Sequence, residues 1–585
     1  MDICSLLWPG GEKTGAISFE TCREDLELDR LSSLLFAGMP MAQGVALAEE
    51  IATRDAEALT WRHEVLEDLL AAPDLAQTFE TVQTLAEEIG WYIEQIHQNA
   101  RGLMMSTAPL ESFKKTVNSL EKLLRRGGNM LLEELDPDDY HAQFVRATIF
   151  FYEHLTRYTQ AMVLLKNALG GAELHAKALV ALRDWVNARY ETDQIDKTLG
   201  QLEQTNAWWT GIGGFAVDAC LDQSMNLESL EMSEIRSRPY SRAGLLDRGA
   251  EEGYDGLTAI SAFPQNSSSV QFQEYLISEL GMQARSELNR LRREIVHLPV
   301  SGRTGIVDLG RELRFFTSAV NLCRRLREAN MPVCRPAFSQ TSAMQAEDMY
   351  MVELALTGQT PAVPNPVDLG LGCVDLLTGA NSSGKTTYVI AAGQLQWLFH
   401  LGCWVPAKSA ALRPVDAIYT LFAAGESDTS EDSRMGLEVE RIAQFSKLMT
   451  PQSLVLLNEP MTSTSASEGI EINIDLLADL VQKQVPCMIV THYNEIYEML
   501  LDRLGPLGLS DKVRSLVMEV RREADGTIRY PYRLTLQPPG RSSYARAIVA
   551  KLGLNLEDML QKMTAAGMDM RPEDPAWSSI HPDET

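Results

Sequence analysis

Residues 379–386, GANSSGKT, have the residue types and spacing of a loop that wraps phosphate groups. Gly379 and Gly384 let the backbone turn its N–H groups toward a β-phosphate, and Lys385 reaches the β- and γ-phosphates. The Thr386 hydroxyl is a ligand for Mg²⁺. We therefore expect ATP with Mg²⁺ to be the cofactor, bound by the following set: Gly379, Ala380, Asn381, Ser382, Ser383, Gly384, Lys385, Thr386 and Thr387.

The segments on either side of this loop are those that a phosphate loop requires. The apolar run VDLLT (374–378) predicts a strand before it, and TYVIAAGQLQWLF (387–399) predicts a helix after it. The amino terminus of that helix would add its dipole to the attraction for phosphate. Strand, glycine-rich turn and helix in this order make a chance match to the motif improbable.

Two further apolar segments end in residues that suit phosphate chemistry. SLVLLNEP (453–460) ends in Asn458–Glu459, where Glu459 is placed to polarise the attacking water. Asn458 stands where an aspartate normally serves Mg²⁺, so it is either a weaker metal partner or a tolerated neutral substitution. PCMIVTHYNEI (486–496) carries His492, which is placed to contact a γ-phosphate. The expected catalytic residues are Glu459, His492 and Lys385, and the expected metal residues are Thr386 and Asn458.

The composition is that of a soluble multidomain protein. The 585 residues are 45% hydrophobic and 23% charged, enough for roughly two to four domains. We find no apolar run of membrane-spanning length, no secretory signal and no cysteine pair at metal spacing, which predicts a cytoplasmic protein. The net charge of −28 argues against loose binding to nucleic acid, although a local basic strip would suffice for specific binding.

The hydrophobic pattern changes along the chain and predicts long α-helices followed by an α/β P-loop domain with a mainly parallel sheet; the family resemblance given below implies that these are an α-helical core and lever domain and an ATPase domain. Amphipathic periodicity over 53–75 and 306–330 indicates long helices, and short apolar strands dominate after Pro332. The expected division is: an N-terminal arm, 1–24; the helical domain, 25–335, with a clamp-like insertion at 205–270; the ATPase domain, 336–565; and a disordered acidic tail, 566–585.

The motifs together resemble the ATPase domain of the MutS family, over roughly residues 340–560. Besides the phosphate loop, the segments that resemble the family are WVPA (404–407), VDAIYTLFAAGESD (415–428), NEPMTSTSASEG (458–469), VTHYNEI (490–496) and RSSYARAIVAKLGL (541–554). The helical half resembles the family's core and lever helix more weakly, over 53–75 and 306–338.

The chain also departs from the family pattern. The core begins near residue 25, which leaves no room for the two domains that precede it in mismatch sensors, and we expect no nuclease domain after the ATPase domain. The letters Phe272-Gln273-Glu274 match the mismatch-reading motif but fall in the helical half, where a coincidence is expected. PAVPN (361–365) lacks the aromatic residue that many members stack on adenine. The chain most resembles bacterial MutS-like proteins that keep only core, lever and ATPase.

The resemblance implies that two ATPase domains face each other and complete each other's sites. The segment 430–442 aligns with the family segment that supplies a serine to the partner's γ-phosphate, which makes Ser433 the candidate; the alternative is a solvent-facing serine. A homodimer, or a related hetero-oligomer, is therefore expected.

Two functions remain open at this point. The first is an ATP-driven switch that binds a DNA structure other than a simple mismatch. Its candidate DNA contacts, which read equally as solvated helix faces, are Arg285, Arg290, Arg292, Arg293, Lys114, Lys115, Lys122, Arg125 and Arg126. The second is an ATP-binding scaffold for a protein partner, with weak hydrolysis and no direct DNA binding. A metabolic kinase is disfavoured because the resemblance covers the whole ATPase domain.

Overall fold

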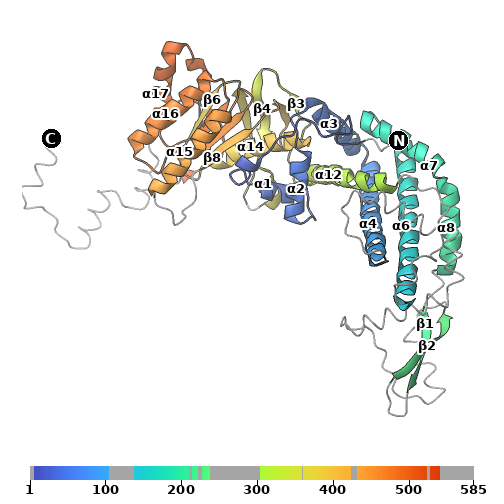
Figure 1. Cartoon of the computed structure of the whole chain (residues 1–585). Coiled ribbons are helices and arrows are strands. Elements are labelled where there is room, and N and C mark those ends of the chain that lie inside the picture. The colour runs from blue at the N-terminus through green and yellow to red at the C-terminus, as the bar shows by residue number, and fades with distance from the viewer. Residues whose placement is uncertain are drawn as a thin grey trace, which may run out of the picture. The chain divides into compact units, whose positions relative to one another are not determined.

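The computed structural model describes residues 5–103, 137–209, 214–221, 227–236, 303–358, 360–422, 431–523 and 528–539. These residues form two compact units (Figure 1). The first unit comprises Met1–Gly11 and Glu67–Thr317, and the second comprises Glu12–Leu66 and Ser318–Thr585. Two helices contain residues of both units: α3 (Ala56–Ala71) and α12 (Arg303–Glu328).

The first unit is built mainly from long helices. Its elements are α4 (Pro73–Leu103), α6 (Pro137–Gly171), α7 (Lys177–Thr192), α8 (Ile195–Trp209) and a hairpin of β1 (Gly214–Leu221) and β2 (Leu227–Arg236). Helices α4 and α6 pack along each other and bury Phe79 and Leu165. The carboxylate of Asp68 accepts the backbone N–H groups of His175 and Ala176, at 2.8 Å each, and so satisfies free donors at the start of α7. The described part of the expected insertion at 205–270 contains the hairpin.

The second unit contains a six-stranded sheet whose order is β14 (Leu534–Leu536), β11 (Val513–Met518), β6 (Val374–Thr378), β10 (Cys487–Val490), β9 (Leu454–Asn458) and β8 (Ile418–Phe422). The pairs β11–β6, β6–β10, β10–β9 and β9–β8 are parallel, and β14 adds an antiparallel edge. Both β6 and β10 are buried along their whole length, which explains their apolar composition.

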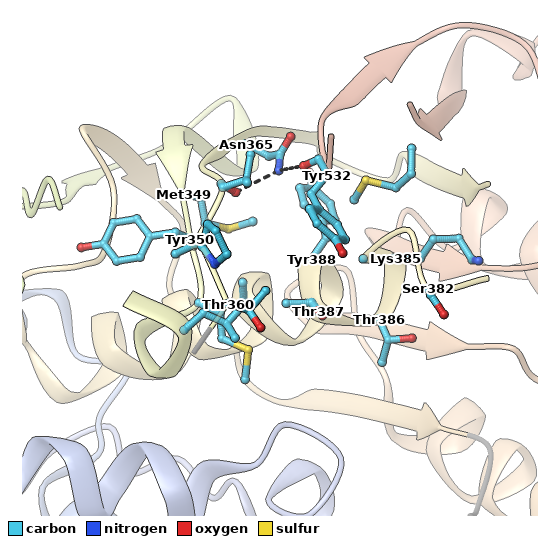
Figure 2. A pocket seen from close by; sticks show the side chains of 18 of the residues that line it. Met349, Tyr350, Thr360, Asn365, Ser382, Lys385, Thr386, Thr387, Tyr388 and Tyr532 are labelled. Carbon is cyan, nitrogen blue, oxygen red and sulfur yellow. Dashed lines mark hydrogen bonds between the residues drawn. The ribbon is translucent and has the colours of Figure 1, made fainter. Parts of the chain in front are cut away.

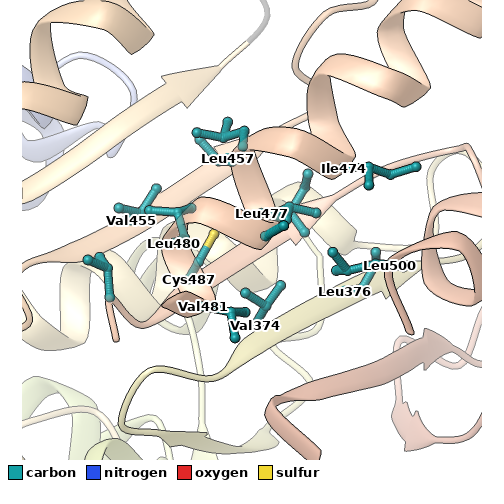
Figure 3. Close-up of a cluster of buried hydrophobic side chains, with 14 of the residues drawn as sticks. Val374, Leu376, Val455, Leu457, Ile474, Leu477, Leu480, Val481, Cys487 and Leu500 are labelled. Carbon is teal, nitrogen blue, oxygen red and sulfur yellow. The ribbon is translucent and has the colours of Figure 1, made fainter. Parts of the chain in front are cut away.

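Helices cover both faces of this sheet. Alternate strand residues pack against α15 (Glu431–Leu448), α16 (Ala466–Gln482) and α17 (Glu495–Leu504), and Figure 3 shows Val374, Leu376, Val455 and Leu457 in this cluster. Helix α14 (Lys385–Leu401) contacts β9 and β10 and contributes no residue to the cluster, so it covers the opposite face. The prediction of a helical region followed by an α/β domain is confirmed.

A second, mixed sheet of four strands adjoins the nucleotide motifs, and the sequence did not predict it. Its order is β3 (Ala337–Phe338), β7 (Ser409–Leu412), β4 (Ser342–Met349) and β5 (Asn365–Gly370). The connection from β4 to β5 contains the short helix α13 (Val352–Thr357). The remaining small elements lie near the end of the unit: η3 (Gly505–Leu507), η4 (Ser510–Lys512), β12 (Arg521–Arg522) and β13 (Ile528–Arg529).

Residues Glu12–Leu66, near the start of the chain, belong to the second unit. They form η1 (Glu20–Cys22), α1 (Leu28–Leu35), α2 (Met41–Ile51) and the first turns of α3. Arg62 of α3 is fully buried and donates hydrogen bonds to the carbonyl oxygens of Ile51 at 2.8 Å and Leu401 at 3.0 Å. Carbonyl groups at the ends of α2 and α14 are thereby satisfied by one guanidinium group. The sequence division had assigned 25–335 to one helical domain, whereas residue contacts group 12–66 with the α/β elements.

None of the helices in the described parts of the chain is long and apolar enough to cross a membrane.

Candidate nucleotide site

The glycine-rich loop joins the buried strand β6 to the amino terminus of α14. Gly379 has φ +144° and Gly384 has φ +94°, which are conformations that residues with a side chain rarely adopt. A Cβ atom on Gly379 would lie 3.1 Å from Cβ of Met518, and one on Gly384 would lie 3.2 Å from the ring of Tyr532. The two glycines are thus required by both backbone angle and space, and they leave the first N–H groups of α14 at the cavity.

The side chain of Lys385 lies against the loop that precedes it. Its ammonium group donates to the carbonyl oxygens of Gly379 and Ala380, at 3.0 Å each. Burial lowers the pKa of Lys385, and the charge of Glu459 opposes that shift. An ammonium group has three N–H donors, so one donor remains beyond these two bonds. In addition, the buried hydroxyl of Ser383 makes no hydrogen bond within the described residues. Both features fit a loop that binds phosphate oxygens.

Thr386 and Asn458 meet across the site. The Thr386 hydroxyl donates to the side-chain oxygen of Asn458 at 2.9 Å, from the start of α14 to the end of β9. Both oxygens are suitable ligands or water partners for Mg²⁺, but neither carries a charge. No cluster of three histidine, cysteine, aspartate or glutamate side chains capable of holding a metal occurs in the described part of the chain. A magnesium ion here would therefore depend on phosphate oxygens for most of its attraction.

Glu459 and His492 are hydrogen-bonded beside the loop, with Nε2 of His492 2.7 Å from Oε1 of Glu459. The hydrogen bond from His492 is the main cause of the lowered pKa of Glu459, with the charges of His492 and Lys385 acting in the same direction and burial opposing. The two residues follow the neighbouring strands β9 and β10, so their closeness results from parallel pairing. The carboxylate is kept ionised, as a group that orients water must be.

The backbone that carries Glu459 is fixed by its surroundings. Glu459 has φ 54° and Met461 has φ 61°, in the left-handed region that costs about 1 kcal/mol or more for such residues. The N–H of Glu459 donates to the carbonyl oxygen of Val490 at 2.9 Å, and the N–H of Met461 donates to the buried carboxylate of Glu438 at 2.8 Å. These contacts hold a strained turn in place at the residue expected to align water. The sequence did not indicate Glu438.

A single cavity of about 480 Å³ joins these groups to a less polar region. That volume lies within the range of small-molecule sites. At one end it is lined by Asn381, Ser382, Gly384, Lys385, Thr386, Thr387, Glu459 and His492. At the other end, part of which Figure 2 shows, it is lined by Met349, Tyr350, Met351, Leu354, Pro361, Ala362, Val363 and Asn365, while Met518 and Tyr532 line it beside the loop. The cavity thus has one end suited to phosphate and one suited to a flat, largely apolar group.

Tyr532 is the aromatic side chain beside the loop, and the sequence analysis missed it. Its backbone is held by Asn365, whose amide nitrogen donates to the carbonyl oxygen of Tyr532 at 2.8 Å and whose amide oxygen accepts the N–H of Leu534 at 2.8 Å (Figure 2). Tyr350 also lines the cavity, but it is buried and its hydroxyl donates to the carbonyl oxygen of Pro332. The missing aromatic residue in PAVPN therefore does not leave the cavity without a partly exposed ring.

Several predicted residues lie outside the described part of the chain. They are the basic strips at 114–126 and 285–293, the Phe272-Gln273-Glu274 letters, the segment 541–554 and the tail 566–585. Ser433 lies in α15, but its side chain is outside the description. The remaining predicted residues, 379–387, Asn458, Glu459 and His492, come from three strand ends and the start of α14.

Comparison with known proteins finds similarity in the C-terminal part of the chain. The family model MutS domain V matches residues 375–562. The DNA mismatch repair protein MutS of Thermus aquaticus is 30% identical over 223 residues, which are 38% of this chain and 26% of that protein. The protein of the same name from Leptospira interrogans is 30% identical over 227 residues, with the same shares, and that of Clostridioides difficile is 25% identical over 233 residues, covering 39% and 23%. The chain thus spans about a quarter of the length of the curated relatives it matches.

Proposed function

The C-terminal part of this chain is that of a MutS-like protein, and from this premise we propose that the protein is an ATP-driven molecular switch. In the proposal, ATP binds in the cavity between Tyr532 and Lys385, and two such domains engage around the bound nucleotides. The observation that carries the proposal is the convergence of Lys385, Thr386–Asn458 and Glu459–His492 at one end of a nucleotide-sized cavity.

Nucleotide binding would begin with an exchange of partners at Lys385. Its ammonium group leaves the carbonyl oxygens of Gly379 and Ala380 in part and turns to the β- and γ-phosphates, while backbone N–H groups of the loop and the α14 dipole hold the remaining charge. Thr386 and Asn458 would hold Mg²⁺, which neutralises charge on the phosphates when bound. The ring of Tyr532 offers a stacking surface for the base.

Hydrolysis would require Glu459 to change partner. In the structure its carboxylate is held by His492 at 2.7 Å, so water must be bound at the same carboxylate or the pair must open. Once the pair opens, Glu459 orients the attacking water and His492 becomes available to a phosphate oxygen. While the pair is closed, the lowered pKa of Glu459 keeps the carboxylate ionised, and after the pair opens the charge of Lys385 still acts to lower that pKa.

We further propose that the engaged form is a homodimer that binds a DNA structure other than a simple mismatch, with Ser433 of one chain completing the site of the other. The relatives are named as DNA mismatch repair proteins, which supports DNA as the class of partner. The test is ATP turnover measured with branched, single-stranded, mismatched and perfect duplex DNA at fixed salt. Stimulation by a branched or single-stranded form above both duplexes is expected, and a clear preference for the mismatch would contradict the proposal.

A second function has specific support and stays in competition. An ATP-binding scaffold for a protein partner, with weak hydrolysis, fits the neutral Asn458 beside Thr386, the closed Glu459–His492 pair and the net charge of −28. The two functions differ in their response to salt, because DNA contacts release counterions and weaken steeply as salt rises. If the protein binds ATP but neither hydrolyses it nor retards any DNA in a gel-shift assay at low salt, the scaffold function is favoured over the switch.

A further inference from the structure

Residues 19–26, which we call the N-terminal segment, pack against α14 in the second unit. Leu26 is fully buried against α14, where a Cβ atom on Gly393 would lie 2.5 Å from the Leu26 side chain. The side chain of Gln394 donates to the carbonyl oxygen of Leu26 at 3.0 Å, and the rings of Phe19 and His400 meet edge to face at 5.7 Å. The N-terminal segment therefore contacts α14 from the middle of that helix to its last turn. Gly393 is required there because a side chain would block the close approach of Leu26.

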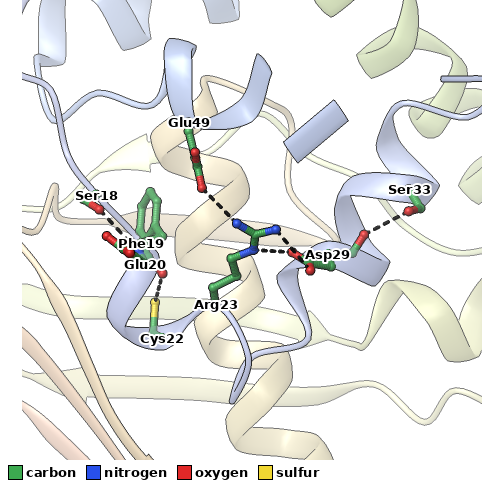
Figure 4. Close-up of polar contacts among 8 residues, drawn as sticks. All are labelled: Ser18, Phe19, Glu20, Cys22, Arg23, Asp29, Ser33 and Glu49. Atoms are coloured by element: carbon green, nitrogen blue, oxygen red, sulfur yellow. Dashed lines mark hydrogen bonds and ion pairs between the residues drawn. The ribbon is translucent and has the colours of Figure 1, made fainter. Parts of the chain in front are cut away.

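Polar contacts within the N-terminal region hold this segment in shape. The guanidinium group of Arg23 pairs with the carboxylates of Asp29 and Glu49 (Figure 4), which links the segment to α1 and α2. The Arg23 pairs are partly exposed, so we expect them to order the segment more than they stabilise the whole unit. The segment can thus act as a preformed piece rather than a loose arm.

Asp25 connects this segment to two further elements. One oxygen of its carboxylate accepts the Thr420 hydroxyl at 2.6 Å, on the edge strand β8, and the guanidinium group of Arg441 at 3.1 Å, on α15. Arg441 also donates to the carbonyl oxygen of Thr420 at 3.1 Å. The Asp25 side chain is 14% exposed and that of Arg441 is 43% exposed. A single, partly buried carboxylate oxygen thus joins an edge strand to the helix beside it.

We propose that Asp25 is a positioning residue for α15, and through α15 for the ATP-driven engagement of two chains. This inference rests on the proposed function, in which Ser433 of α15 completes the partner's site. Ser433 precedes Arg441 by about two turns of the same helix. The N-terminal segment also packs against α14, which begins at Lys385. It therefore fixes α14, which follows the phosphate loop of the same chain, relative to α15, which is proposed to act on the partner chain's site.

The contacts of Asp25 predict a loss of pairing between two chains without a loss of ATP affinity, whereas a purely structural role would lower both. Asp25 is not among the described residues that line the cavity, whose polar end includes Lys385, Thr386, Glu459 and His492. Loss of its charge should therefore leave ATP affinity of the isolated chain intact. The same loss should weaken engagement, because α15 is released from β8 and from the N-terminal segment.

The experiment compares Asp25→Asn and Arg441→Gln with Glu24→Gln, which removes the neighbouring, exposed carboxylate. All are made in a Glu459→Gln background, so that bound ATP persists. ATP affinity is measured at protein concentrations where the chain is monomeric, and ATP-dependent pairing is measured by sedimentation velocity. We expect ATP affinity within about twofold of the parent, and a roughly five- to tenfold higher concentration for half-pairing in both variants, as befits one charged hydrogen bond at a partly exposed site.

The control variant should pair as the parent does, and the double variant Asp25→Asn with Arg441→Gln should lose no more than the larger single loss. Pairing equal to the parent in both single variants would overturn the inference. So would an equal loss of ATP affinity and pairing, since that indicates a general effect on folding. If the Glu459→Gln parent itself does not pair with ATP, the proposed function fails, and this inference fails with it; a paired parent with unaffected variants would refute the inference alone.

Discussion

The two ends of the cavity are built in different ways. The phosphate end comes from the loop after β6 and the residues after β9 and β10, three parallel strands that pair directly or through one neighbour. The part of the cavity that we propose for the base comes from separate segments around Met349, Pro361, Met518 and Tyr532, which end strands of two different sheets or lie in irregular chain. Strand ends in one parallel sheet converge by geometry, whereas the other set is brought together by particular tertiary contacts such as those of Asn365.

This contrast assigns different work to each end. The phosphate end contains the charged groups and the strained backbone at Glu459, so it should control both chemistry and the free energy of binding. The part proposed for the base offers apolar surface and the partly exposed ring of Tyr532, so it should contribute affinity in smaller amounts. The following substitutions test that division, in order of decreasing effect.

Glu459→Gln should have the largest effect, on hydrolysis alone. An amide is uncharged and cannot accept a proton from the water that it orients. The single-turnover rate should therefore fall by about 10²- to 10⁴-fold, whereas ATP affinity should stay near the parent value. Rapid-quench measurement of one turnover, paired with calorimetry, checks both halves. Hydrolysis at the parent rate would mean that another residue aligns the water.

Lys385→Ala should reduce ATP affinity by at least about a hundredfold, because a buried cation that meets two phosphate groups is lost. Circular dichroism should show an unchanged fold. Lys408→Ala is the matched control, since Lys408 is an exposed lysine paired with Glu347 and away from the cavity. ATP affinity equal to the parent in calorimetry would remove the phosphate assignment.

Tyr532→Ala should weaken ATP binding by roughly tenfold, in the range of one stacked ring, while Tyr532→Phe should stay close to the parent. Inorganic triphosphate separates the two ends, because it reaches only the phosphate groups. Competition by triphosphate should be the same in all three proteins. A parallel loss of triphosphate binding in Tyr532→Ala would show that the ring supports the loop at Gly384 and not the base.

Asn458→Asp should lower the Mg²⁺ concentration needed for half-maximal ATP binding by a few-fold, since a carboxylate attracts a divalent cation more strongly than an amide. The effect on the hydrolysis rate has no fixed sign if closure limits turnover. A Mg²⁺ titration of nucleotide binding compares the two proteins. An unchanged Mg²⁺ requirement would show that Asn458 has no part in metal binding despite its bond to Thr386.

The smallest effect concerns pH. Since His492 is the main cause of the lowered pKa of Glu459, His492→Asn should raise that pKa and move the acid limb of hydrolysis upward by less than about one pH unit. The stability contributed by the pair follows the same sign: it is present above the ordinary pKa of glutamate and is lost as pH falls through the lowered value. The pH dependence of the hydrolysis rate, measured for parent and variant between acid and neutral pH, tests the shift. An acid limb at the same pH in both proteins would show that this limb does not report the ionisation of Glu459.

The sequence predicted residues that the structure brings together at one end of the cavity, and it missed most of the remaining lining for a physical reason. Lys385, Glu459 and His492 follow short apolar runs, and the ends of buried parallel strands meet at one edge, so local pattern and sheet geometry were sufficient. Tyr532 stands in an irregular segment with no periodic signal, and only its contact with Asn365 places it at the cavity. Asp25 and Arg62 act on elements far along the chain, which no local pattern shows.

Asn458 marks the limit in the other direction. The sequence left open whether it serves Mg²⁺ weakly or is a neutral substitution, and its bond to Thr386 gives the geometry of a metal partner without the charge of one. The left-handed backbone of Glu459 was equally invisible in the sequence, because glutamate has no preference for that conformation.

The central claim is that two chains complete each other's sites around ATP, and the specific hydrolysis rate against protein concentration tests it most directly. Hydrolysis per chain is measured at saturating ATP and Mg²⁺ over a wide range of dilution, with the fraction of paired chains determined in the same samples. The account predicts that hydrolysis per chain rises in proportion to the paired fraction and then reaches a plateau. A rate per chain that is the same for single and paired chains would contradict it.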